Sequence, residues 1–198
     1  VGAPYEHSSG AYLGAIYLVL GGQLGTLDLS AADARRTGQT AGDQAGYAVA
    51  GGGDIDGDGY DDLLIGAPEN DAGGGGAGAV YLLRGPISGD SGLSGADAVL
   101  VGEDNDDNAG CSLAMNGDLD GDGAVDLLIG ARLDDSAASD AGAAYLLLGV
   151  PSGTVDLSAA DGKILGEASG DWLGDSVSMG GDVDGDGIDD ALVGVPAA

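Results

Sequence analysis

Aspartates alternate with other residues in three short segments of this chain. Each segment reads Asp-x-Asp-Gly-Asp-Gly-x-x-Asp, which places carboxylates at positions 1, 3, 5 and 9 of a glycine-rich loop. Carboxylates at alternating positions of a tight loop can all point at one centre, and calcium takes about six to eight oxygen ligands. The spacing therefore predicts three Ca²⁺ ions, one in each loop.

The expected ligands are the four aspartate side chains of each loop and the backbone carbonyl of position 7, where no side chain offers a usable oxygen. Glycines between the aspartates let the loop curl without clashes of a Cβ atom. The predicted ligand residues are Asp54, Asp56, Asp58, Tyr60 and Asp62; Asp118, Asp120, Asp122, Ala124 and Asp126; and Asp182, Asp184, Asp186, Ile188 and Asp190.

Other metals and the EF-hand fit the loops less well. Magnesium demands a near-ideal octahedron and keeps its waters, and zinc prefers histidine and cysteine, which the loops lack. An EF-hand needs glutamate at position 12, where this chain has Ile65, Ile129 or Val193. Because four carboxylates around one centre repel one another, we expect calcium binding to contribute to the free energy of folding.

The loops recur with a 64-residue period, since their first aspartates are Asp54, Asp118 and Asp182. Glycines, tyrosines and leucines elsewhere follow the same period without gaps, which is typical of repeat architectures. We interpret the chain as one repeat region, residues 1–198, with the second part of a repeat at 1–45, full repeats at 46–109 and 110–173, and the first part of a repeat at 174–198.

Four short apolar runs in each full repeat predict β-strands. In the repeat 46–109 the runs begin at Tyr47, Asp62, Ala79 and Ala98, and no longer segment keeps a helical period beyond a turn around residues 30–34. Blades of four antiparallel strands that stack around an axis form a β-propeller. We expect an all-β chain with about three blades, which is either part of a longer array or completed by other copies. A β-solenoid is the alternative fold.

The amino-acid composition of the chain limits the classes of binding partner that it fits. The chain has 34 acidic and 5 basic residues and a formal net charge of −29, which argues against binding of nucleic acid or of an anionic membrane surface. For the acidic residues outside the loops, the alternative interpretation is that they only keep the protein surface solvated. The single cysteine, Cys111, cannot form an internal disulfide, and we expect an inert thiol there. No apolar run approaches the length of a membrane span, and no signal segment begins the chain.

The sequence contains only weak candidates for catalytic residues. Gly89-Asp90-Ser91-Gly92 resembles the surroundings of a nucleophilic serine, but it lies in a variable connector far from the only histidine, His7, which we expect in a loop. The acidic run from Glu103 to Asn108 is interpreted as a solvated loop, with a weak cation site as the alternative. The repeated tyrosines predict blade core. Burial against a neighbouring blade is expected for Trp172, with a ligand-stacking surface as the alternative.

The repeated motifs resemble the FG-GAP repeats of integrin alpha-subunits and of bacterial secreted proteins. The second half of the FG-GAP motif stands at Gly2-Ala3-Pro4 and Gly66-Ala67-Pro68, and is weakened at Gly130-Ala131-Arg132 and Gly194-Val195-Pro196. The first half stands at Ala45-Gly46, Ala109-Gly110 and Leu173-Gly174, without the phenylalanine. The resemblance implies a propeller with calcium on one face and an extracellular role in adhesion or ligand binding.

From these observations we expect a non-catalytic, calcium-binding scaffold outside the cell whose partner is a protein or a polysaccharide. Two alternatives remain open at the level of sequence. The chain can be a structural subunit that assembles with other copies into a ring or fibre, or an accessory propeller of a secreted enzyme whose chemistry lies elsewhere.

Overall fold

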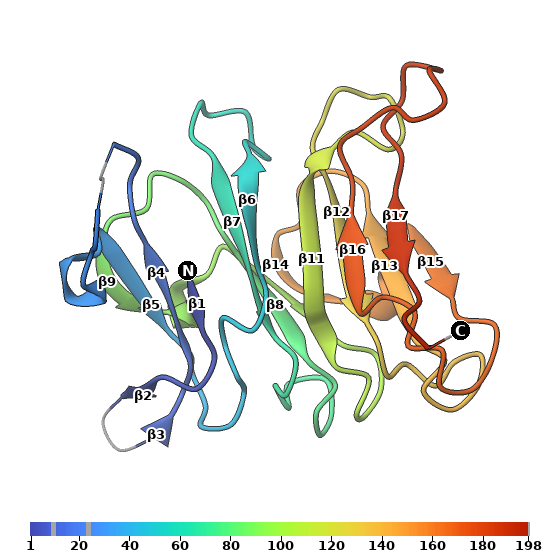
Figure 1. Cartoon of the computed structure of the whole chain (residues 1–198), viewed down its shortest axis with the longest axis horizontal. Coiled ribbons are helices and arrows are strands. Elements are labelled where there is room, and N and C mark those ends of the chain that lie inside the picture. Colours follow the sequence, from blue (N-terminus) through green and yellow to red (C-terminus); the bar gives the residue numbers. More distant parts are fainter. Residues whose placement is uncertain (9–10, 23–24, 198) are drawn as a thin grey trace.

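Antiparallel β-sheets make up the computed structural model, which describes residues 1–8, 11–22 and 25–197 (Figure 1). The central blade consists of strands β6 (Val49–Gly53), β7 (Asp62–Ala67), β8 (Ala79–Leu83) and β10 (Ala98–Val101). Neighbouring strands pair in the order β6-β7-β8-β10, each antiparallel to the next. The prediction of four strands in each repeat is confirmed for this blade.

The blades on either side repeat this order. The following blade contains β11 (Ala109–Gly117), β12 (Asp126–Ala131), β13 (Ala143–Leu147) and β15 (Gly162–Leu165). The preceding blade contains β1 (Gly2–Ala3), β4 (Ala15–Leu18) and β5 (Ala34–Thr37). Strands β16 (Ser176–Ser178) and β17 (Leu192–Gly194) form a further two-stranded sheet. This arrangement is a partial β-propeller, as the repeat period predicts.

An additional outer strand on two of the blades is not predicted from the sequence. Strand β9 (Gly89–Gly92) pairs in parallel with β5, and β14 (Gly153–Asp156) pairs in parallel with β10. Each of these strands follows the third strand of its own repeat, yet it completes the outer edge of the preceding blade. Gly89-Asp90-Ser91-Gly92 is therefore an edge strand instead of a nucleophile's turn.

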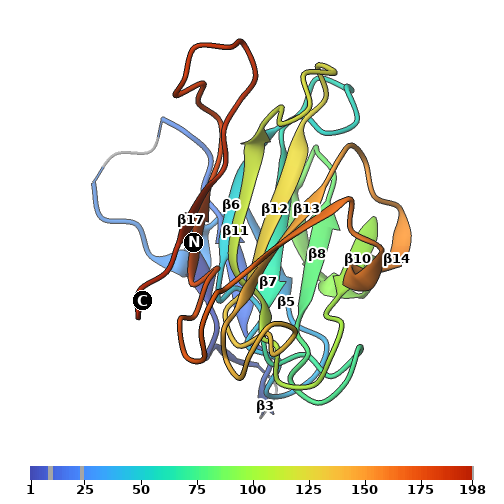
Figure 2. The same ribbon diagram turned by 90° about the vertical axis from the view of Figure 1, so that its right-hand side faces the viewer.

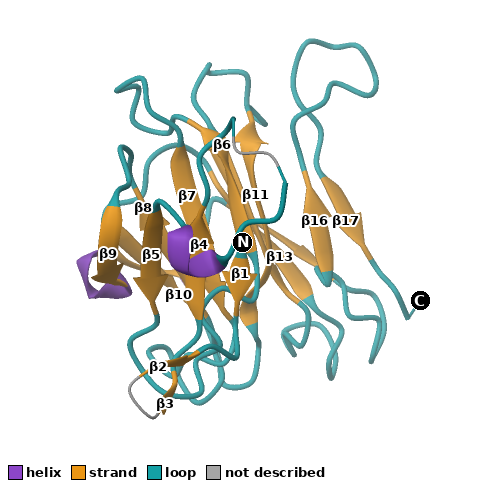
Figure 3. Cartoon of the chain, turned by 60° about the vertical axis from the view of Figure 1, so that its left-hand side comes forward, coloured by secondary structure: helices purple, strands orange, loops and turns teal. Residues whose placement is uncertain are grey.

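Short turns connect the outer strands. The 3₁₀ turns η1 (Leu29–Ala31), η2 (Leu93–Gly95) and η3 (Leu157–Ala159) stand at equivalent places of the repeats, and η1 confirms the turn predicted near residue 30. Figure 3 draws helical turns in purple, one of them beside β9. The side chain of Asp28 accepts from the backbone N–H of Ser30 and so caps the first of these turns. His7 lies in a two-residue strand, β2 (His7–Ser8), which pairs with β3 (Ala11–Tyr12), so the loop expected there is wrong.

The hydrophobic core lies between the blades because the sheets stack face to face. Leu64 and Leu82 of the central blade pack with Met115 and Leu127 of the next blade, all at most 1 % exposed. Full burial of such a side chain contributes about 1.5–3 kcal/mol. The first strands β6 and β11 lie side by side (Figure 1), and small residues in β6 permit this close approach.

Glycines of the repeated motif mark where the backbones of successive blades touch. A Cβ atom on Gly66 would overlap the carbonyl oxygen of Gly110, and one on Gly130 would overlap that of Gly174. Both added atoms would lie far inside van der Waals contact. The two halves of the motif therefore meet across the boundary between neighbouring blades, where only glycine fits.

Candidate metal centre

The three Asp-rich loops occupy the same place in successive blades. They connect β6 to β7, β11 to β12 and β16 to β17, and all project from the same end of the sheets (Figure 2). The residue at position 2 fixes two of the loops to the blades: Ile55 is buried in the core between two blades, and Leu119 packs against the next core. Val183, at the third equivalent position, is 88 % exposed.

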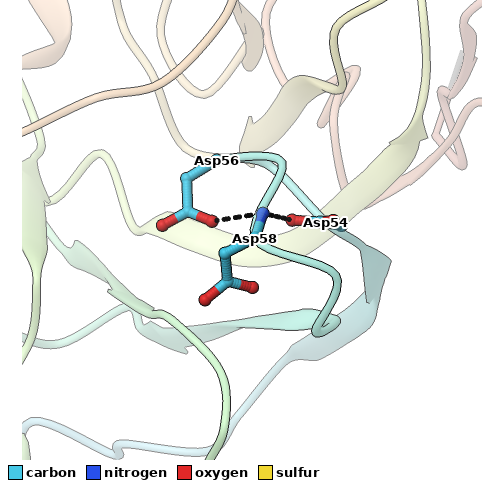
Figure 4. Close-up of side chains that lie close together, drawn as sticks. All are labelled: Asp54, Asp56 and Asp58. Atoms are coloured by element: carbon cyan, nitrogen blue, oxygen red, sulfur yellow. Dashed lines mark hydrogen bonds between the residues drawn. The ribbon is translucent and has the colours of Figure 1, made fainter.

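In the first loop, Asp54 organises the backbone around its carboxylate (Figure 4). Its Oδ1 accepts from the N–H groups of Gly57 at 2.8 Å and Asp58 at 3.0 Å, and its Oδ2 accepts from the N–H of Gly59 at 2.8 Å. These bonds require a chain reversal, which the positive φ angles of Gly57 and Gly59 supply. Glycine adopts such angles without steric cost.

The other two carboxylates of this loop close shorter turns. Oδ1 of Asp56 accepts from the N–H of Asp58 at 3.2 Å, and Oδ1 of Asp58 accepts from the N–H of Tyr60 at 2.9 Å. Each bond spans two residues, the pattern of an Asx turn. The same bonds recur in the second and third loops between 2.6 and 3.1 Å.

The aspartate at position 9 links each loop to its strands. Oδ2 of Asp62 accepts from the N–H of Ile55 at 2.8 Å, and its Oδ1 accepts from the N–H of Gly85 at 2.8 Å, beyond the third strand. Asp126 makes the equivalent bonds to Leu119 and Gly149. Burial raises the pKa of Asp126, although the two backbone bonds oppose this rise. Position 9 therefore has a structural part in each loop whether or not it also binds an ion.

Carboxylate oxygens converge in each loop, which is the arrangement that a hard cation requires. Within each of three groups, one ligand atom per residue lies within 4.8 Å of the others. The structure brings together positions 1, 3 and 5 in the first and second loops, but positions 1, 3 and 9 in the third. The groups are Asp54, Asp56 and Asp58; Asp118, Asp120 and Asp122; and Asp182, Asp184 and Asp190.

The residues present fit a calcium ion in their chemistry, because every group consists of carboxylates and has exposed members. Asp62, Asp126 and Asp186, which the sequence also predicts as ligands, lie outside these groups. The carbonyl oxygens of Tyr60, Ala124 and Ile188 stay predicted ligands. Calcium bound in a loop would supply the positive charge that offsets the repulsion between the converging carboxylates.

Contacts beyond the loops also involve these aspartates. The Nε of Arg84 lies 3.5 Å from Oδ2 of Asp56 and so gives the first loop a cationic neighbour. The second and third loops contact each other directly: the N–H of Asp118 donates to Oδ2 of Asp189 at 3.1 Å, and the N–H of Asp189 donates to the carbonyl of Asp118 at 3.1 Å. Changes in one of these two loops can therefore reach the other.

A second acidic cluster lies away from the loops, and sequence reasoning missed it. Asp107 and Asn108, interpreted as part of a solvated run, are 2 % and 5 % exposed. Burial raises the pKa of Asp107 to about 6, and the charge of Asp134 adds to this rise. Burial would also raise the pKa of Asp134, but hydrogen bonds from Lys163 and Ser136 outweigh burial and lower it. The recurrence of Asp43, Asp107 and Asp171 was the signal available in the sequence.

The structure also tests the expectations for the repeated tyrosines, for Trp172 and for Cys111. Tyr81 and Tyr145 are 3 % and 0 % exposed, so the prediction of blade core is confirmed for them, whereas the equivalent Tyr17 is only partly buried. Trp172 is 44 % exposed, so the expected burial is wrong; its φ of 57° turns the chain at a surface position. Cys111 is a buried free thiol, and burial raises its pKa, which disfavours the reactive thiolate.

Comparison with known proteins places the chain among repeat proteins. Residues 45–83 match the FG-GAP repeat family. The chain is 35 % identical over 162 residues to integrin alpha-5 of Xenopus laevis, 39 % over 95 residues to integrin alpha pat-2 of Caenorhabditis elegans, and 31 % over 167 residues to integrin alpha-PS2 of Drosophila melanogaster. These alignments cover 75 %, 47 % and 80 % of the chain.

The same alignments cover 14 %, 8 % and 12 % of the three relatives, so the chain spans a small part of their length. Among the described residues, no helix has the length and apolar character needed to cross a membrane.

Proposed function

Because this chain belongs to the family of FG-GAP, integrin alpha-like repeat proteins, we propose that it is a non-catalytic, calcium-stabilised propeller segment that acts outside the cell as an adhesion or interaction scaffold. Its partner in this proposal is a protein or a polysaccharide. The repeats 46–109 and 110–173 are its structural units, each with one calcium loop.

The observation that carries the proposal is the convergence of three carboxylates within 4.8 Å in each loop. Each loop also holds its backbone in a fixed turn through bonds to its own aspartates, so that the oxygens are positioned before an ion binds. We infer that calcium clamps the first and second strands of each blade at this end, because the loops join those strands.

Calcium removal tests this role. A ligand that binds only the folded state stabilises it by RT ln(1 + [L]/Kd), which is about 2.7 kcal/mol at a concentration about one hundred times Kd. We expect the melting temperature in about 1 mM CaCl₂, roughly a hundred-fold above a Kd of about 10 μM, to exceed that in EDTA by several degrees. Identical melting curves in the two conditions would overturn the structural role of calcium.

Single-residue variants locate the ions. Asp58→Asn should remove the calcium dependence contributed by the first loop, since Asp58 is one of its three converging carboxylates. Asp61→Asn is the matched control, because it changes the charge of the same loop at position 8, outside the converging group. Isothermal titration should count one calcium fewer in the first variant and an unchanged number in the second.

A further inference from the structure

One position in the blades places a cation against a buried tyrosine. In the third blade, the ammonium of Lys163 lies 2.6 Å from Oε2 of Glu103, 2.9 Å from Oδ2 of Asp134 and 2.7 Å from the hydroxyl of Ser136. It also lies 4.7 Å from the centre of the Tyr145 ring, within the range of a cation–π interaction.

The first blade has a similar arrangement. Arg35, two repeats before Lys163, donates to Glu6 at 2.6 Å and lies 5.7 Å from the centre of the Tyr17 ring. Glu6 and Tyr17 are the repeat equivalents of Asp134 and Tyr145. Two blades therefore fill this position with a side-chain cation from the fourth strand.

The central blade lacks that cation and has a cavity in its place. The equivalent of Lys163 is Val99, and a cavity of about 370 Å³ opens beside it. The residues that line the cavity include the equivalents of the four groups that face the Lys163 ammonium and of Asp107, whose carboxylate interacts electrostatically with Lys163. These lining residues are Gln39, Asn70, Ala72, Tyr81 and Asp43, which correspond to Glu103, Asp134, Ser136, Tyr145 and Asp107.

The cavity keeps negative charge without a positive partner in its lining. Asp43 and Asp71 contribute carboxylates, and the lining contains no lysine or arginine. Asp43, which is 2 % exposed, accepts from the amide of Asn70 at 2.7 Å. Burial raises the pKa of Asp43, and the charge of Asp71 adds to this rise. Each carboxylate would gain from a bound cation.

We propose that this cavity binds a small primary alkylammonium ion from solution. The carbonyl oxygen of Gln39, at the place of the Glu103 carboxylate, would accept from the ammonium, and the Tyr81 ring would face it. Val99 and Val101, which also line the cavity, provide apolar surface for the alkyl chain. The site lies beside β10 and the connections after β5 and β7, at the end of the blades opposite the calcium loops (Figure 1), so its occupancy is independent of the proposed calcium sites.

Butylammonium, which reproduces the end of a lysine side chain, tests the proposal. We expect a dissociation constant of about 1 mM, typical of a ligand with few atoms, and shifts of backbone amide NMR signals near Gln39 and Val99. The titration is performed with calcium in excess, so that a failure here does not depend on the calcium proposal. 1-Butanol should bind at least ten-fold more weakly, because it lacks the charge.

Single-residue variants distinguish binding of butylammonium in the cavity from nonspecific binding of this cation to the acidic surface. Val99→Lys should abolish butylammonium binding, because the new side chain reproduces Lys163 and fills the cavity. Asp71→Asn should weaken binding several-fold, whereas Asp135→Asn, the same change in the blade whose site Lys163 fills, should leave it unchanged. No shifts with butylammonium, equal binding of butanol, binding retained in Val99→Lys, or equal weakening by both asparagine variants would overturn the proposal.

Discussion

Replacement of Asp107 by asparagine is expected to stabilise the protein at neutral pH. Asp107 is 2 % exposed, its Oδ2 accepts one hydrogen bond from the N–H of Asp104 at 3.0 Å, and the charge of Asp134 faces it. Burial and this like charge raise the pKa of Asp107 from 3.8 to about 6. An asparagine at this position can still accept the bond from Asp104 but carries no charge to desolvate.

The magnitude follows from linkage between protonation and folding. Because the pKa of Asp107 is higher in the folded state, the folded protein binds the proton more tightly, and stability falls as pH rises from about 4 to about 6. A shift of about two units at about 1.36 kcal/mol per unit corresponds to about 3 kcal/mol. The Asp107→Asn variant should therefore exceed the wild type by up to about 3 kcal/mol at pH 7.5 and by little at pH 4.

Urea unfolding of both proteins at pH 4 and pH 7.5, with calcium fixed, measures this difference. Asp43→Asn is the matched control, because Asp43 accepts a hydrogen bond from Asn70 at the place where Asp107 faces the charged Asp134. This bond opposes the effects of burial and of the Asp71 charge on the pKa of Asp43, so the gain should be smaller. A stability difference between wild type and Asp107→Asn that is the same at both pH values would refute the reasoning.

Two further predictions concern the backbone. Gly130→Ala should lower the free energy of unfolding by about 2–4 kcal/mol in urea melts, because its Cβ would overlap the carbonyl oxygen of Gly174. Gly95→Ala, where an added Cβ meets no neighbouring atom, should leave it unchanged or slightly higher. Trp172→Asn should raise the melting temperature by a few degrees, since asparagine tolerates the left-handed backbone better and already occupies the equivalent position at Asn108; an unchanged or lower value would contradict this.

The repeat and the strand order could be predicted because they depend on local pattern. The apolar run at residues 79–83 coincides with β8, and the run from Asp62 coincides with the start of β7. Alternating aspartates predict that carboxylates gather in each loop, but they do not predict which ones: positions 1, 3 and 5 converge in the first two loops and positions 1, 3 and 9 in the third, although the spacing is the same. The glycines of the motif could be recognised, but their contact across blades depends on stacking that no single repeat contains.

Features that depend on contacts between residues far apart in the sequence could not be predicted from local pattern. Strand β14 is polar and short, and it pairs with β10 only because the chain returns to the outer edge of the preceding blade. Asp107 lies in an acidic run that is typical of a solvated loop, but it is buried, and the following connection contacts it through the N–H of Leu133, which donates to the carbonyl of Asp107. The burial expected for Trp172 is wrong because the side chain is 44 % exposed, whereas Asn108, at the equivalent position and with a similar left-handed backbone, is 5 % exposed.

The parallel edge strands make the first two blades depend on the repeat that follows each of them. Strand β14 belongs to the third repeat in sequence and to the central blade in hydrogen bonding. If one repeat unfolds, the blade before it loses its outer strand as well as its neighbour's packing surface. The free energy that couples adjacent repeats is therefore large relative to the intrinsic stability of one repeat, and such an array unfolds with high cooperativity along the chain.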